Sequence, residues 1–225
     1  VIPVNPFQWT GIAILIGIAC WMILGLIWYR QADIAYALGN NLDKTGNYQE
    51  AYPQLLQAVQ MIPNESVYKD ELAIDLAALA AGFYSQKDAT HGATFARNAI
   101  ALSDEVVSNH PNNVVYWKNR VRLFYTLSAS DKSNEKLYLQ QAVKAIDTAK
   151  ALAPTDAKIS YNQGILYGQI GQTTKAVDIL NETIKLKPDY ATAYVALGLF
   201  YHELAIDKNG KVIDPDMQKK AIDTY

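Results

Sequence analysis

One spacing of small residues, tyrosine and proline recurs along this chain, and it constrains the fold more than any other sequence feature. In residues 161–188 it is carried by Gly164, Tyr167, Gly171, Ala176, Leu180 and Pro188. A position without a long side chain lets two helices approach closely, a second glycine supplies the turn between them, and proline ends the second helix. The pattern therefore predicts a pair of short, packed helices.

The same pattern returns elsewhere in the chain. Residues 36–63 carry it at Leu38, Gly39, Gly46, Tyr48, Ala51, Leu55, Ala58 and Pro63. A third copy keeps only its second helix on pattern, at Ala142, Ile146, Ala149 and Pro154, and a last copy begins with Leu197, Gly198 and Tyr201. Pro154 and Pro188 are 34 residues apart, which is the period of the tetratricopeptide repeat (TPR). In these segments the chain resembles TPR proteins.

The residues between these copies predict less regular helices. We expect one helix over residues 66–85, another over 89–109 and a third from about residue 113 to 128. The first has apolar residues three and four positions apart, at Leu72, Leu76, Leu79 and Phe83. The sequence thus predicts an all-α fold, a right-handed TPR-like α-solenoid of about five helix pairs with the last incomplete. The expected pairs cover residues 31–63, 66–111, 113–154, 157–188 and 191–225.

The first 29 residues contain no charged side chain. Residues 11–29 read GIAILIGIACWMILGLIWY, and as a helix they span about 28 Å, close to the thickness of a bilayer's hydrocarbon core. Aromatic rings, which prefer the headgroup level, stand at both ends of this segment, as Phe7, Trp9, Trp28 and Tyr29. We expect a transmembrane helix within residues 1–30, with membrane contact through residues 8–29. A signal peptide would begin with basic residues, and a buried core helix of a soluble repeat protein is the other alternative.

No glycine or proline lies between Trp28 and Ile34. We therefore expect the membrane helix to continue into the first repeat helix and to end near Thr45. The chain does not begin with methionine, and its uncharged residues 1–6 fit a short loop leaving an earlier membrane helix. The sequence looks cut from a longer protein with further membrane helices. Basic residues beside the apolar segment are too few to choose the side of the membrane on which the repeats lie.

The last repeat contains an insertion between its two helices, AIDKNGKVIDPD. Asn209 and Gly210 form a strong signal for a two-residue hairpin turn, which would place Ile206 opposite Ile213. We expect a short β-ribbon or a plain loop here. The acidic residues do not follow the calcium-binding spacing of an EF-hand.

The sequence contains no pattern of catalytic residues. His91, His110 and His202 lie far apart and match no metal-ligand motif. The single cysteine, Cys20, allows neither an internal disulfide nor a cysteine metal cluster. A net charge of −2 without a basic block gives no reason to expect nucleic acid as a partner. We predict no catalytic residue, no metal and no cofactor in this chain.

A binding surface remains as the predicted function. Stacked helix pairs curve so that the first helix of each pair lines a concave face, and tyrosine and arginine carry much of the binding energy at interfaces. The polar and aromatic residues expected on this face are Asp33, Tyr36, Asn40, Asp43, Lys118, Arg122, Tyr125 and Tyr161. We expect a protein or peptide ligand in the groove; solvated side chains without a ligand are the alternative.

The junction of the apolar helix with the first repeat resembles a narrower family. An apolar helix ending in WYRQADIAYALGNNLDKTGNYQEAYPQLLQAVQMIPNESVYKDELA is similar to the C-terminal part of O-antigen ligase family membrane proteins with TPR tails. The resemblance implies a bacterial inner-membrane protein whose glycan-transfer residues precede this region, so none is assigned here. The chain would then be a non-catalytic tail. The alternative is a single-pass membrane TPR scaffold or assembly factor with no enzymatic part.

Overall fold

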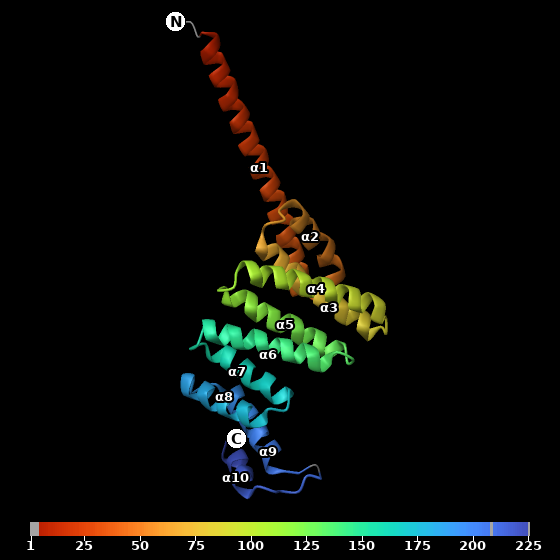
Figure 1. Cartoon of the computed structure of the whole chain (residues 1–225), viewed down its shortest axis with the longest axis vertical. Coiled ribbons are helices and arrows are strands. Elements are labelled where there is room, and N and C mark those ends of the chain that lie inside the picture. Colours follow the sequence, from red (N-terminus) through yellow and green to blue (C-terminus); the bar gives the residue numbers. More distant parts are fainter. Residues whose placement is uncertain (1–4, 208, 225) are drawn as a thin grey trace. The chain divides into compact units, whose positions relative to one another are not determined.

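The computed structural model describes residues 5–207 and 209–224. Over these residues the chain forms ten helices and no strand (Figure 1), which confirms the predicted all-α fold class. The helices are α1 (Pro6–Lys44), α2 (Tyr48–Met61), α3 (Ser66–Ser85), α4 (Ala89–Asn109), α5 (Val114–Ser130), α6 (Glu135–Leu152), α7 (Ala157–Gln169), α8 (Thr173–Leu186), α9 (Ala191–Ala205) and α10 (Pro215–Thr224).

Polar caps fix several of the helix starts. The Asp88 carboxylate accepts the backbone N–H of His91 at the start of α4, and the Asn113 side chain accepts that of Val115 at the start of α5. Such caps satisfy N–H groups that the first turn leaves without a partner. Helices α3 and α4 have the bounds expected from the sequence, and α5 continues two residues beyond the expected end at residue 128.

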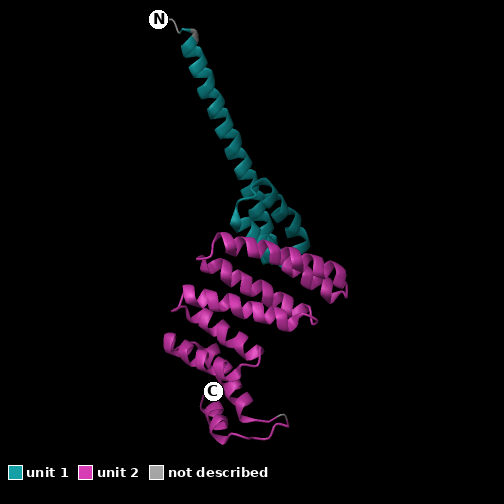
Figure 2. Ribbon diagram, in the orientation of Figure 1, with its two compact units in different colours: residues 1–75 teal, residues 76–225 magenta. Residues whose placement is uncertain are grey.

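The chain divides into two compact units, residues 1–75 and 76–225, shown in teal and magenta in Figure 2. The division falls within α3.

In the first unit, α1 runs without interruption from the apolar segment into the first repeat, as expected. It starts with a capping box, in which the side chains of Asn5 and Gln8 each accept the other's backbone N–H at 2.9 Å. Gly46 follows its C-terminal end with φ +80, a conformation that favours glycine. One 18-residue window of α1 has a mean hydropathy of 2.4 and is entirely unburied. By length and composition, α1 can cross a membrane.

The C-terminal part of α1 packs against α2. Ala32 and Ala35 form a buried cluster with Ala58 of α2 and Tyr68 of α3. Further along α1, a Cβ placed on Gly39 would lie 2.6 Å from the Cγ atom of Leu55. The missing side chain is therefore what lets the two helices of the first repeat approach, as the repeat pattern predicted.

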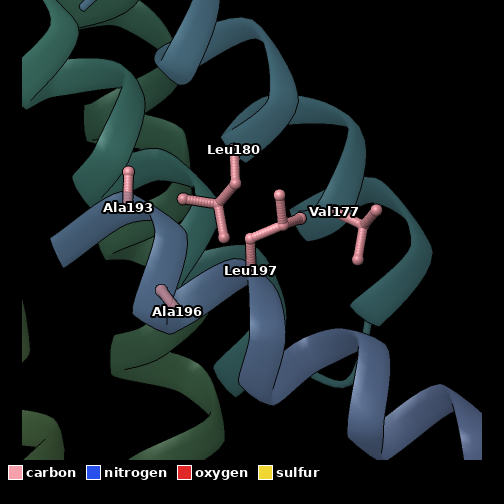
Figure 3. Close-up of a cluster of buried hydrophobic side chains, with 5 residues drawn as sticks. All are labelled: Val177, Leu180, Ala193, Ala196 and Leu197. Carbon is pink, nitrogen blue, oxygen red and sulfur yellow. The ribbon is translucent and has the colours of Figure 1, made fainter. Parts of the chain in front are cut away.

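In the second unit, successive helices form packed pairs, α5 with α6, α7 with α8 and α9 with α10. Within the α7–α8 pair, a Cβ on Gly164 would lie 2.9 Å from the Cγ atom of Leu180, and Gly171 makes the turn with φ +78. The next pair is joined through a cluster of side chains from α8 and α9 that point toward one another (Figure 3). Its buried members are Val177, Leu180, Ala193, Ala196 and Leu197.

In the insertion between α9 and α10, the described residues include an isolated antiparallel bridge between Ile206 and Val212. The expected pairing of Ile206 with Ile213 is therefore wrong by one residue. Gly210 takes φ +76, and the Asp207 N–H donates to the Lys211 carbonyl at 2.9 Å, so the connection is one residue longer than a two-residue turn. The Asp207 carboxylate also accepts the Lys211 N–H, which stabilises the longer turn.

Candidate functional site

A groove of about 370 Å³ lies between α5 and α7 in the second unit. It is lined by Lys118, Val121, Arg122 and Tyr125 from α5 and by Tyr161, Asn162, Ile165 and Leu166 from α7. Positions three and four apart share a helix face, which is why each helix contributes one continuous stripe. Four of the eight residues expected on a binding face, Lys118, Arg122, Tyr125 and Tyr161, therefore lie together.

The opposite face of α5 holds the groove residues in place. Leu123, Phe124 and Leu127 are almost completely buried, with 0–2% of their surface exposed. α7 is held in turn by the α8–α9 cluster, because Tyr161 and Ile165 pack against it. Burial of these apolar faces fixes the side chains between them on a rigid surface.

The cations of α5 have two different roles. Arg120 turns away from the groove, pairs with Asp104 at 2.5 Å and lies 4.9 Å from the centre of the Phe124 ring. Lys118 and Arg122 are exposed, and neither forms an ion pair within the part of the chain that the structure describes. No carboxylate is among the residues that line the groove. Two positive charges without a counter-charge therefore stand over an apolar floor.

Aromatic and amide groups complete the surface. The Gln169 side chain of α7 donates to the Tyr125 hydroxyl at 3.2 Å, and Tyr161 lies with its ring centre 5.2 Å from that of Tyr190. The floor beneath them is half-buried Val121 and Ile165 and buried Leu166. The arrangement offers hydrogen bonds, ring faces and positive charge to an extended ligand.

The other four expected residues lie in the first unit and take part in helix packing there. Asp33 accepts a hydrogen bond from the Tyr68 hydroxyl, and burial followed by this bond raises the pKa of Tyr68. Tyr36 stacks on the same ring with centres 4.9 Å apart and accepts a hydrogen bond from the Asn40 side chain at 3.0 Å. Asp43 is only 3% exposed. That these four bind a partner stays a prediction.

Sequence reasoning missed half of the groove lining. Asn162 lies next to Tyr161, and Val121, Ile165 and Leu166 are apolar, whereas the residues predicted for this face were polar or aromatic. The signal that could have found Val121 and Ile165 is their position three or four residues from Lys118 and Tyr161 on the same helix face. Among the described residues, no group of three or more His, Cys, Asp or Glu side chains could hold a metal ion.

Comparison with known proteins identifies the repeats. The family model of the tetratricopeptide repeat matches residues 32–65 and 157–190, so the chain contains TPR repeats. No curated protein sequence matches the chain.

Solved structures of TPR proteins have the same fold. MamA from Desulfovibrio magneticus RS-1 is 18% identical with a TM-score of 0.60, over 86% of this chain and 94% of that one. A thermophilic TPR protein from Thermus thermophilus is 19% identical with a TM-score of 0.55, over 86% and 98%. YrrB, described as a TPR protein with an unusual peptide-binding site, is 15% identical with a TM-score of 0.51, over 84% of both chains. At these identities the likeness shows the fold alone.

Proposed function

We propose that this chain is a membrane-anchored TPR interaction module whose α5–α7 groove binds an extended peptide segment rich in carboxylates. The observation that carries this proposal is the pair of exposed, unneutralised cations, Lys118 and Arg122, over the apolar floor of the groove. The structural likeness to YrrB, a TPR protein with a peptide-binding site, supports a peptide as the kind of ligand.

Charge and shape both favour such a segment. The guanidinium of Arg122 can donate two parallel hydrogen bonds to one carboxylate, and Lys118 supplies a second positive charge one helical turn away. Tyr125 and Tyr161 offer ring faces beside the cations, and the floor offers Val121 and Ile165 to an apolar side chain of the ligand. An acidic segment with an apolar or aromatic residue would use every part of this surface.

The binding proposal can be tested with an array of random peptides probed with the fluorescently labelled, detergent-solubilised chain. We expect bound peptides to be enriched in Asp and Glu, and their Asn and Gln counterparts to bind at least about tenfold more weakly. The double variant Lys118→Gln, Arg122→Gln should lose binding to a similar extent. A matched control, Lys144→Gln with Lys219→Gln, removes two exposed lysines outside the groove and should bind as the parent does. Bound peptides without acidic enrichment would refute the proposed ligand class.

The membrane part of the proposal rests on the N-terminal half of α1. Residues 8–29 carry no charge, and the side chains of this stretch are exposed in the structure. Exposure of a long apolar surface to water is costly, at about 25 cal/mol per Å², and a bilayer removes that cost. We therefore propose an integral membrane protein with contact through residues 8–29, in the bacterial inner membrane that the O-antigen ligase resemblance implies.

We further propose that the chain is the non-catalytic C-terminal tail of an O-antigen ligase or polymerase-type protein that handles polysaccharide. The support is the resemblance of the join, Trp28-Tyr29-Arg30-Gln31-Ala32-Asp33, together with the continuity of α1 across it. The gene sequence upstream of Val1 tests this directly. Several further hydrophobic spans would support the ligase-type protein, whereas a start codon within a few residues would leave the single-pass scaffold.

A further inference from the structure

Two side chains at the end of the apolar segment hold the turn between α2 and α3. The indole N–H of Trp28 donates to the Met61 carbonyl at 3.1 Å, and the Tyr29 hydroxyl donates to the Glu65 carboxylate at 3.1 Å. The turn itself is closed by the Glu65 N–H, which donates to the Ile62 carbonyl at 3.1 Å. Residues 62–65 therefore lie beside the last residues of the apolar segment.

Because of the direction of α2, this turn is the part of the first repeat that lies nearest to the apolar segment of α1. Leu55 meets Gly39, Ala58 clusters with Ala32, and Met61 meets Trp28, so α2 runs antiparallel to α1. With a rise of 1.5 Å per residue, the start of α2 lies about 20 Å further from the apolar segment than its end does.

We infer that the α2–α3 turn, residues 62–65, sits in the headgroup layer of the membrane that residues 8–29 span; this inference rests on the proposed membrane anchoring. Tryptophan and tyrosine prefer the headgroup level, and here both rings give their hydrogen bonds to the turn and to the residue before it. The turn is thereby held at the depth at which these two rings lie. The first repeat would then contact the lipid headgroups through this turn, in addition to the contact that the apolar part of α1 makes with the bilayer.

The turn suits that depth chemically. Pro63 and Asn64 are exposed and uncharged. The one carboxylate in the turn, that of Glu65, accepts the Tyr29 hydroxyl and also the backbone N–H of Val67 at 3.3 Å. A charge that enters a less polar layer is tolerated when its oxygens are hydrogen-bonded, and both oxygens of Glu65 have a donor.

Spin labels on the full chain, reconstituted into phosphatidylcholine vesicles, test the inference. The native Cys20 is labelled in the parent chain, and Asn64→Cys and Lys44→Cys are each labelled in a Cys20→Ser background. Collision rates with oxygen and with a water-soluble nickel complex then report the depth of each label. We expect the Cys20 label to meet oxygen and to be shielded from nickel, and the Lys44→Cys label to be open to nickel. The Asn64→Cys label should lose nickel accessibility relative to Lys44→Cys while remaining less shielded than Cys20.

The two ways of failing can be told apart. Equal nickel accessibility at positions 64 and 44, with Cys20 shielded, would refute the location of the turn in the headgroup layer. The proposed membrane anchoring would still stand. If the Cys20 label were as accessible to nickel as the Lys44→Cys label, the proposed membrane anchoring would be refuted. The inferred location of the turn in the headgroup layer would be refuted with it.

Discussion

At single residues, packing between helices depends on where a side chain has room. A Cβ on Gly39 would lie 2.6 Å from Leu55 Cγ and 3.1 Å from the Leu55 backbone nitrogen, so the backbone as well as the side chain would have to move. Gly82 in α3 has no atom within 4 Å of its Cβ position. The same substitution by alanine at Gly39 and at Gly82 therefore compares a crowded position with an open one.

We predict that Gly39→Ala lowers the free energy of unfolding by about 1–3 kcal/mol, because overpacking displaces α2 from α1. Gly82→Ala should raise it by about 0.5–1 kcal/mol, because alanine in a helix loses less backbone entropy on folding. Chemical unfolding followed by circular dichroism in detergent measures both. Similar effects of the same sign would contradict the close approach at Gly39.

Asp75 is a buried acid whose ionisation opposes folding. It is 0% exposed, and neither of its carboxylate oxygens has a hydrogen-bond partner among the described residues. Burial, and then the charges of Asp43 and Glu71, raise the pKa of Asp75 from 3.8 to about 8. The folded chain therefore keeps a proton on this group between about pH 4 and pH 8, where the unfolded chain has lost it.

A group whose pKa is raised on folding stabilises the protein at low pH and loses that effect as the pH rises through the folded-state value. We predict that the parent chain loses stability, on the order of a few kcal/mol, between pH 5 and pH 8. Asp75→Asn should flatten this dependence. Thermal unfolding of both proteins at the two pH values in one detergent measures it, and parallel curves would show that other groups cause the change.

The groove residues show how far a sequence predicts a site. Lys118, Arg122, Tyr125 and Tyr161 were predicted for the binding face as polar or aromatic residues of the first helix of a pair, and they line one groove. Asp33 and Tyr36 were predicted on the same grounds but contact Tyr68, a residue of α3. Whether a polar face meets solvent or another helix depends on the position of that helix, and a single sequence does not encode it locally.

At the scale of elements, the apolar segment and the first helix of the first repeat form one continuous helix, α1. The sequence predicted this continuity, since no helix-breaking residue lies between Trp28 and Ile34. It also predicted the bounds of α3 and α4, and in α3 the apolar residues three and four positions apart indicated the helix. The partner predicted for Ile206 in the loop after α9 was wrong by one residue. The reason is that Asn209-Gly210 fits both a two-residue turn and a longer turn in which Gly210 takes a left-handed conformation.

We predict that spin labels on Cys20 and on Lys44→Cys lie about 36 Å apart along one straight helix axis, with a narrow distance distribution. Insertion of Gly-Gly-Ser after Arg30 should broaden that distribution, because glycine breaks the helix. Insertion of three alanines at the same place should lengthen the distance and keep the distribution narrow. Pulsed dipolar spectroscopy measures all three proteins, and a broad distribution in the parent chain would refute a rigid α1.

For the whole molecule, two surfaces have different chemistry and lie in different units. The first unit carries the uncharged half of α1, and the second carries the cationic groove between α5 and α7. A net charge of −2 for the chain hides this local positive charge, so overall composition did not reveal it. We propose that the first surface meets lipid and that the second binds an acidic segment.

We predict that the chain, expressed in bacteria, stays with the membrane pellet after alkaline carbonate washing and is released by detergent. A charged residue at the centre of a transmembrane helix costs about 2.5–3.5 kcal/mol on the translocon scale, so Ile16→Arg with Ile23→Arg should move the protein out of the carbonate-resistant pellet. Ile16→Leu with Ile23→Leu changes shape without charge and should remain there. Recovery of the parent chain in the soluble fraction without detergent would instead favour a soluble repeat protein.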